Sequence, residues 1–361
     1  MNRGTSSAFI ALKKSELIIG ISAILVFFLS KPYFVWFNIP ASLFIISLSV
    51  LFLLKSKIDI DSAPYLMIFL LLYLTLLMRS KLNIYGVTSI FLMISIFIAD
   101  TEYLDKVYAA YAKLFAITII PSLIIYALVT FANYEITATI LEPLNPLKKG
   151  FYYQYPFLVK WNHFMTRFSG YYDEPGAVGT VSAILLMSRS FNLKDKLNIP
   201  IFIAGILSLS LFFYVTLFVY SMLFARTRYK ITLLLIGVTL YTLLSSNEVL
   251  YQLLFLRLEI HDGILVGLNR TEGNFDQWYE SFKHTDDYLW GLGGGANDKY
   301  NSGGASYKDL IVNYGVIYFG LFMVAMSGYA WKKIQSLKYF VIYLYILFGV
   351  VFQRPFITDM F

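Results

Sequence analysis

The sequence predicts an all-α integral membrane protein, with about 11 apolar segments that cross or enter the bilayer. The 361 residues are 58% hydrophobic and only 14% charged, whereas a soluble domain carries about 25% charged residues. The shortage of charge extends along the whole chain, and the basic residues divide unevenly between the two ends of the apolar runs. These observations favour one polytopic membrane domain over residues 1–361 rather than a soluble domain with an anchor.

The apolar runs come close to the length of a membrane helix, which is about 20 residues. The first run follows basic residues, as in a signal peptide, but no small-residue cleavage site follows it, so we expect a retained helix. The runs cover residues 17–30, 34–54, 64–78, 82–99, 114–131, 176–189, 199–225, 230–245, 308–329 and 336–353.

Charge decides whether the run at 199–225 forms one tilted helix or two short ones. A split near Ser208 to Phe213 leaves most basic residues in short segments on the side of the N-terminus: Arg3, Lys13, Lys14, Lys55, Lys57, Lys106, Lys113, Arg189, Lys194, Lys196, Arg226, Arg228, Lys230, Lys332, Lys333 and Lys338. The short segments on the other side then hold only Lys31, Arg79, Lys81 and Arg354. The positive-inside rule therefore favours the split, a cytoplasmic N-terminus and an outer C-terminus. The two helices of this run would be short or partly re-entrant.

Two long hydrophilic loops, at about 132–175 and 246–306, lie on the outer face in this topology. The remaining basic residues fall in these loops or just after them: Lys148, Lys149, Lys160, Arg167, Arg257, Arg270, Lys283, Lys299 and Lys308. The three histidines, His163, His261 and His284, lie there too. The net charge of +7 is explained by basic cytoplasmic turns, so we expect no nucleic-acid partner. Any chemistry is expected on the outer face.

The stretch "RFSGYYDEPGAVGT", from Arg167 to Thr180, has two interpretations. Pro175 suits the first position of a helix, and Asp173 and Glu174 would be stabilised near that helix N-terminus by about 0.3–1 kcal/mol. The stretch is then a capped helix start. Alternatively, the fork of Arg167 binds phosphate oxygens while a carboxylate acts as general base.

The second loop adds two cations on the same side, Arg257 and Arg270. Arg257 can instead form a salt bridge with Glu259, Asp262 or Glu272. The glycines of "GLGGGAN" are not followed by the Lys-Ser/Thr of a P-loop, so we interpret them as a flexible turn. With no cysteine and no helical pairing of histidines, no metal site is predicted. Several aromatic residues can stack on sugars or form an interfacial belt: Tyr152, Tyr153, Tyr155, Trp161, Tyr171, Tyr172 and Trp278.

These motifs resemble those of the Wzy-type O-antigen and capsular polysaccharide polymerases, within the O-antigen polymerase/ligase superfamily. The resemblance rests on "RFSGYYDEPGAVG" and on "NRTEGNFDQWYESF", "YLWGLGGG" and "GASYKDLIVNYGVIYFGLFM", and spans residues 160–330. Gly315, Val316 and Gly320 fit the Gly-Val/Ile-x-x-x-Gly helix of that family. Relatives often carry a Ser-Arg turn where this chain has Ser208–Ser210, without the arginine.

The resemblance implies a GT-C-like helical fold and an inverting membrane glycosyltransferase of the bacterial cytoplasmic membrane, without metal or cofactor. It would move a growing glycan from polyprenyl pyrophosphate to a lipid-linked repeat unit, for lipopolysaccharide or capsule. Membrane lipid, a chain-length regulator and a flippase are its expected partners. The site residues would be Arg167 and Arg270 as pyrophosphate contacts, with Arg257 and Lys308 beside them. Glu174 is the first choice of general base, Asp173 the second, and His284 the last.

Two other functions compete with a polymerase. A lipid-linked oligosaccharide flippase or transporter would hold its charges in a central cavity between helices, whereas here they lie in long outer loops. An O-antigen ligase, or an acyltransferase of the same pathway, is the other alternative. Superfamily ligases carry a histidine where this chain reads "GGASYKDLI", and its absence favours the polymerase.

Overall fold

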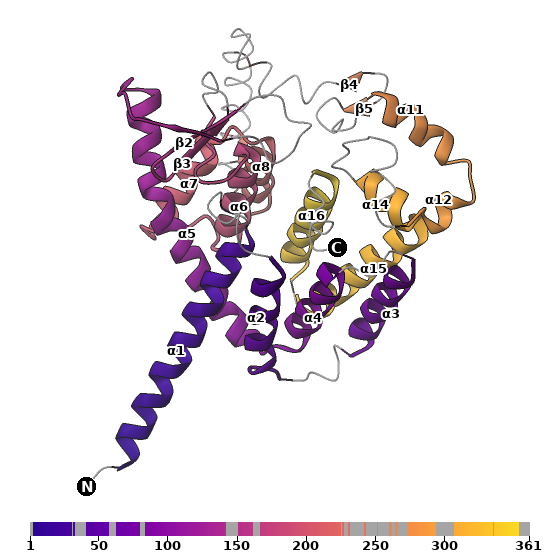
Figure 1. Cartoon of the computed structure of the whole chain (residues 1–361), viewed down its shortest axis with the longest axis horizontal. Coiled ribbons are helices and arrows are strands. Elements are labelled where there is room, and N and C mark those ends of the chain that lie inside the picture. The colour runs from indigo at the N-terminus through magenta and orange to yellow at the C-terminus, as the bar shows by residue number, and fades with distance from the viewer. Residues whose placement is uncertain are drawn as a thin grey trace. The chain divides into compact units, whose positions relative to one another are not determined.

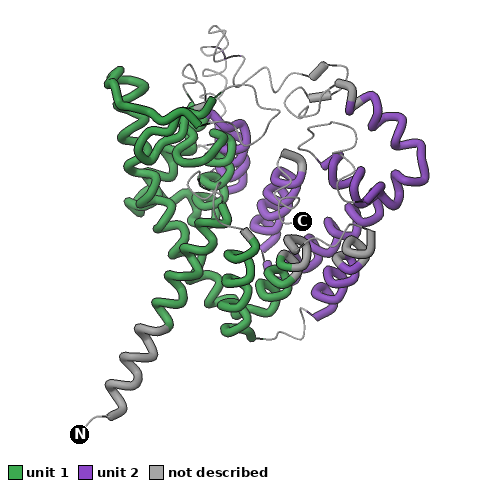
Figure 2. The backbone as a smooth tube through the Cα atoms, in the orientation of Figure 1, with its two compact units in different colours: residues 1–62, 87–208 green, residues 63–86, 209–361 purple. Residues whose placement is uncertain are grey.

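The computed structural model describes residues 3–30, 32, 41–57, 63–79, 84–141, 151–161, 167–224, 226, 230–231, 242, 251, 260–261, 264–265, 273–293, 307–334 and 336–353. These residues are mostly helical, as the sequence predicts, with two small antiparallel sheets (Figure 1). The chain divides into two compact units. Unit 1 contains residues 1–62 and 87–208, and unit 2 contains residues 63–86 and 209–361 (Figure 2).

Unit 1 contains the first candidate loop and the helices around it. Its elements are α1 (Arg3–Leu29), α2 (Ala41–Leu53), most of α4 (Ile84–Ile98), α5 (Thr101–Thr130), β1 (Thr139–Leu141), β2 (Tyr152–Tyr155), β3 (Leu158–Trp161), α6 (Pro175–Ser188) and α7 (Asn198–Leu207). Apolar side chains of α2, α4 and α5 form one of its buried clusters, around Phe52 and Tyr103. The Tyr103 hydroxyl also shares a 2.7 Å hydrogen bond with Ser22, which ties α5 to α1.

Unit 2 contains the second candidate loop. Its elements are α3 (Ala63–Arg79), α8 (Leu211–Phe224), β4 (Ile260–His261), β5 (Ile264–Leu265), α11 (Gly273–Phe282), α12 (Asp287–Trp290), α14 (Tyr307–Tyr314), α15 (Val316–Lys333) and α16 (Leu337–Gln353). Aromatic pairs join its helices. Phe69 of α3 meets Phe322 of α15 edge to face, with ring centroids 5.9 Å apart, and Phe212 of α8 stacks on Tyr345 of α16 at 5.9 Å.

Among the described helices, α5 is the one that is both long enough and apolar enough to cross a membrane by itself. Its 30 residues extend for about 45 Å, against a hydrocarbon core of about 30 Å. The pair α14 and α15 would be a second crossing if it is counted as one broken span. Several further helices are apolar but have only 10–17 residues, so the prediction of about 11 segments stays a prediction.

The predicted split of the run at 199–225 is confirmed. Helix α7 ends at Leu207 and α8 begins at Leu211, with Leu209 between them in the left-handed region at φ 47°. The two helices have 10 and 14 residues, which correspond to about 15 and 21 Å. Each is shorter than a bilayer core, as expected for short or re-entrant segments.

The run at 308–329 differs from its prediction as a single helix. It forms α14 and α15, which are bent by 119° at the break between them. Gly315 stands at this break with φ 86° and ψ 158°, a conformation that side-chain-bearing residues rarely adopt. The apolar pattern continues through the break, so periodicity alone did not reveal it.

The break is closed by the glycine-rich turn that follows α12. The N–H groups of Leu292 and Gly293 donate to the carbonyls of Val312 and Asn313 at 2.8 and 2.9 Å, and the Gly315 N–H donates to Ile311 at 2.7 Å. The last carbonyls of α14, which a helix leaves without internal partners, are thereby satisfied. The predicted flexible turn "GLGGG" is therefore a structural cap at the positions that the structure describes.

Gly291 and Gly315 lie against each other, backbone to backbone. A Cβ atom on Gly315 would lie 2.3 Å from the Leu289 carbonyl oxygen, and one on Gly291 would lie 2.5 Å from the Gly315 nitrogen. Both residues also have positive φ, 81° and 86°. Only glycine fits at these two positions without moving the main chain.

We expect Gly315→Ala to lower the free energy of unfolding by about 2–4 kcal/mol, because it combines a left-handed conformation with overpacking. Thermal denaturation of the purified protein in detergent measures this. Gly320→Ala is the matched control, since a Cβ there meets nothing within 4 Å and an alanine in a helix stabilises by about 0.4–1 kcal/mol. Equal thermal midpoints for the two variants would show that the backbone contact between Gly291 and Gly315 leaves room for a Cβ atom.

Candidate functional site

The candidate site in unit 1 is the segment 167–174, called the Arg167 segment below. It connects to the end of α7 at its first two residues. The Arg167 side chain is 9% exposed, and its Nε donates to the Ser208 carbonyl at 3.0 Å. The Phe168 N–H donates to the Leu207 carbonyl at 2.9 Å. Arg167 therefore brings a cation and a donor to a helix C-terminus, where both are stabilising.

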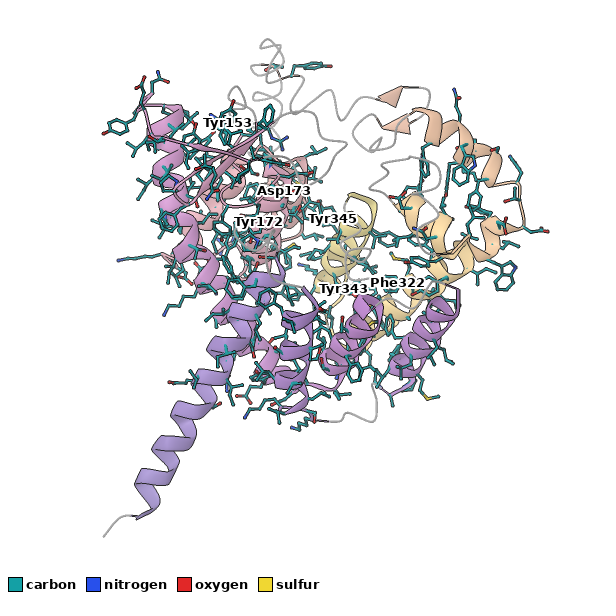
Figure 3. All side chains as sticks on the ribbon, viewed as in Figure 1. Tyr153, Tyr172, Asp173, Phe322, Tyr343 and Tyr345 are labelled. Atoms are coloured by element: carbon teal, nitrogen blue, oxygen red, sulfur yellow. The ribbon has the colours of Figure 1, made fainter. Side chains whose placement is uncertain are left out.

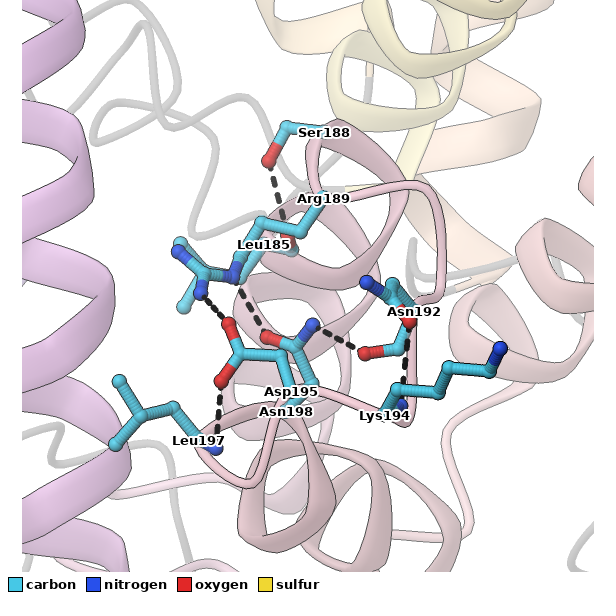
Figure 4. Close-up of polar contacts among 8 residues, drawn as sticks. All are labelled: Leu185, Ser188, Arg189, Asn192, Lys194, Asp195, Leu197 and Asn198. Atoms are coloured by element: carbon cyan, nitrogen blue, oxygen red, sulfur yellow. Dashed lines mark hydrogen bonds and ion pairs between the residues drawn. The ribbon is translucent and has the colours of Figure 1, made fainter.

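A polar turn at the opposite end of the hairpin holds α6 beside α7 (Figure 4). Arg189 Nε donates to Asn198 Oδ1 at 2.6 Å, and the same guanidinium pairs with Asp195. The Asn198 amide donates to the Asn192 carbonyl at 2.8 Å. Because α6 and α7 run antiparallel from this turn, the start of α6 and the end of α7 lie at the same end of the pair.

Tyr171 and Tyr172 anchor the Arg167 segment inside unit 1. They are 3% and 2% exposed, and their hydroxyls share hydrogen bonds of 2.8 Å with Thr118 of α5 and 2.9 Å with Ser30 after α1. Burial raises the pKa of both phenols, so both remain protonated. Of the two alternatives that the sequence leaves open for them, stacking on a sugar does not fit, since their rings are buried against Phe27, Phe115 and each other.

Two more aromatic residues are buried rather than open to a sugar. Tyr152 and Tyr155 of β2 are 2% and 3% exposed. Tyr153 and Trp278 are half-buried, so stacking on a sugar remains a prediction for these two. The side chain of Trp161 lies outside the described residues.

Asp173 and Glu174 lie directly before α6, and both are half-buried. Figure 3 shows Asp173 next to Tyr172 at this point. Pro175 occupies the first helical position, as the sequence predicts, and Glu174 is the N-cap with φ −136° and ψ 136°. The Glu174 side chain makes no capping hydrogen bond; its main-chain carbonyl accepts one from Ala177 at 3.0 Å. The carboxylate is thus placed at the helix start without side-chain capping.

A three-stranded antiparallel sheet, in the order β1-β2-β3, supports the Arg167 segment from the other side. The Val159 N–H of β3 donates to the Gly170 carbonyl at 2.6 Å, and the Ser169 hydroxyl donates to the Val159 carbonyl. The turn between β2 and β3 is in turn held by Ser122 of α5, whose hydroxyl donates to the Phe157 carbonyl at 2.5 Å. The sequence did not predict these strands.

Lys160 of β3 is a buried lysine that the sequence analysis counted only as one basic residue of the loop. It is 6% exposed, although lysine is rarely buried without a charged partner. No residue within the described ranges forms a hydrogen bond or ion pair with it. Burial lowers the pKa of its ammonium group. The alternation of "YQYPFLVKW" is the one signal that places this lysine in a strand.

The other predicted site residues belong to unit 2 or lie outside the described residues. Lys308 belongs to unit 2, where its Nζ lies 5.3 Å from the centre of the Tyr279 ring in a cation–π contact. His284 is exposed in the turn after α11. Arg257, Arg270 and His163 lie outside the described residues. Within the described ranges, no group of three or more acidic, histidine or cysteine side chains could hold a metal ion.

Comparisons with protein-family models, with curated proteins and with solved structures give no match to this chain. The structure brings three of the predicted site residues, Arg167, Asp173 and Glu174, onto one anchored segment and adds Lys160 on the neighbouring strand.

Proposed function

We propose that this protein is a metal-independent membrane glycosyltransferase that polymerises polysaccharide repeat units. One observation carries the proposal. Arg167, held at Nε by a helix-end carbonyl, stands on the same anchored segment as Asp173 and Glu174, which directly precede α6. A fixed cation and a placed carboxylate are what glycosyl transfer from a pyrophosphate carrier requires.

The proposed reaction uses these residues in two roles. Glu174 takes the proton of the acceptor sugar hydroxyl, whose oxygen attacks C1 of the growing glycan. The bond from C1 to the polyprenyl pyrophosphate breaks, and the configuration at C1 inverts. Arg167, with Arg270 and more weakly Arg257 and Lys308, stabilises the charge that develops on the leaving pyrophosphate. Asp173 is the alternative base.

The proposal places the chain in the bacterial cytoplasmic membrane with about 11 membrane segments, a GT-C-like arrangement and an N-terminus in the cytoplasm. The short helices and the capped break support it, because a helix that ends in apolar surroundings needs its last carbonyls satisfied by protein groups. The Arg167 segment and α11 would then both lie on the outer face.

We expect Arg167→Ala and Arg270→Ala to abolish long glycan chains, since loss of a transition-state donor lowers turnover by about 10²–10³-fold. Each variant is expressed in a strain without the native gene. Immunoblots of the membranes confirm that the variant protein is present, and glycan ladders are then compared on gels. Arg167→Lys keeps the cation but loses the fork, so it should give shortened ladders. Lys194→Ala, at an exposed site between α6 and α7, is the control. Normal ladders in the arginine variants would show that these residues are not needed as pyrophosphate contacts.

Glu174→Gln should reduce polymerisation by about 10²–10⁴-fold, the usual contribution of a general base, while binding of lipid-linked donor remains. The measurement is turnover and donor affinity of the purified enzyme with a defined lipid-linked repeat unit. Glu135→Gln, at an exposed position of the same outer loop, serves as control. If Asp173→Asn is inactive and Glu174→Gln is active, the two carboxylates exchange roles.

Reporter fusions test the topology independently of activity. A phosphatase fused at Asp276 should be active, because the proposal puts α11 outside the membrane. A phosphatase fused at Arg228 should be inactive, because basic turns stay in the cytoplasm. The same result at both positions would contradict the split of the run at 199–225 into segments that return to the same side.

A further inference from the structure

Lys160 is fixed in the strand that supports the Arg167 segment. It pairs with Tyr153 across the β2–β3 register, and its neighbour Val159 pairs with Gln154. On the other edge of β3, Val159 is bound to Ser169 and Gly170. One hydrogen-bonded frame therefore holds both Lys160 and the segment that carries Arg167.

The surroundings of Lys160 are apolar and aromatic. Leu158 and Tyr155 share its face of the hairpin by strand alternation, and they are 1% and 3% exposed. A lysine can bury its aliphatic stem and keep its ammonium in water, which would make it an ordinary packing residue. Here the whole residue is 6% exposed, and no hydrogen bond or ion pair to its ammonium lies among the described residues. A buried cation without a partner is unfavourable unless an anion joins it.

We propose that Lys160 is a substrate-binding residue that contacts the diphosphate group of the lipid-linked glycan, as a second cation on the hydrogen-bonded frame that carries Arg167. The inference deepens the proposed function and rests on it. Arginine supplies a planar fork and lysine a compact point charge, so the two together suit a diphosphate with several oxygens. The ammonium of a lysine that is 6% exposed interacts more strongly with such an anion than that of a surface lysine does.

The test compares Lys160→Met with the wild-type full chain in nanodiscs of neutral phosphatidylcholine, with geranylgeranyl pyrophosphate as the probe. Methionine keeps the stem and removes the charge. We expect the affinity to fall by about 10–100-fold, the effect of one charge-assisted hydrogen bond. Without probe, the thermal midpoint should be equal to that of the wild type or higher. Lys194→Met, at an exposed position, should change neither quantity.

Two outcomes of this comparison overturn the inference. Unchanged affinity in Lys160→Met means that the lysine does not contact the diphosphate. A lower midpoint together with lower affinity means that Lys160 acts through the fold.

A second measurement uses the unmodified protein, so it does not depend on the variant's folding. Lysines are acetylated with an amine-reactive reagent and mapped by mass spectrometry. Geranylgeranyl pyrophosphate should protect Lys160 at least tenfold. Nanodiscs that contain phosphatidylglycerol, without the probe, should give no protection; if they protect equally, the anion is a bilayer headgroup and the inference is wrong.

Failure of this inference can be distinguished from failure of the proposed function. If glycan ladders remain normal in the Arg167 and Glu174 variants while Lys160 is protected by the probe, the catalytic roles proposed for Arg167 and Glu174 fail and the diphosphate contact of Lys160 holds. If those ladders are lost while Lys160→Met keeps both affinity and ladders, the polymerase proposal holds and Lys160 has no part in it.

Discussion

The constraint on which the rest of the structure depends is the need to satisfy the last carbonyls of helices that end inside the protein, as α7 does at Ser208 and α14 beyond Val312. A helix leaves its last four carbonyls without internal partners, and an apolar environment offers no water to replace them. At the end of α7 the donors come from Arg167 and Phe168. At the end of α14 they come from Gly315 and from the turn after α12. In each unit, a short helix and a loop from elsewhere in the sequence therefore stabilise each other.

This constraint gives Arg167 two roles at one position. Its Nε holds the end of α7, so the plane of the guanidinium is set before any substrate arrives. Preorganised cations of this kind stabilise developing charge without reorganising during the reaction. Tyr171 and Tyr172 fix the same segment to α5 and to the end of α1. The backbone of Asp173 and Glu174 is thus positioned by the buried tyrosines that precede it.

Local sequence signals predicted the features that depend on neighbouring residues. Proline at the start of α6 is of this kind, because proline fixes its own φ. The break between α7 and α8 was predicted instead from the distribution of basic residues along the whole chain. The break at Gly315 could not be found in this way, since an apolar run looks the same whether its helix is straight or bent. The capping of α7 by Arg167 joins residues 41 positions apart, and the burial of Lys160 depends on strand register and packing. Such contacts exist only once the chain has folded.

Arg167 and Lys160 are both buried cations of unit 1, but they differ in how their burial is compensated. Arg167 meets the negative end of α7 and a carbonyl acceptor, which together offset part of its desolvation. Lys160 meets neither among the described residues, which offer no compensation for the burial of its charge. An anion bound to Lys160 would remove that penalty, and binding would then stabilise the fold in proportion to ligand concentration. Arg167 thus contributes to the structure through the end of α7, whereas Lys160 would become favourable only when the proposed diphosphate is bound.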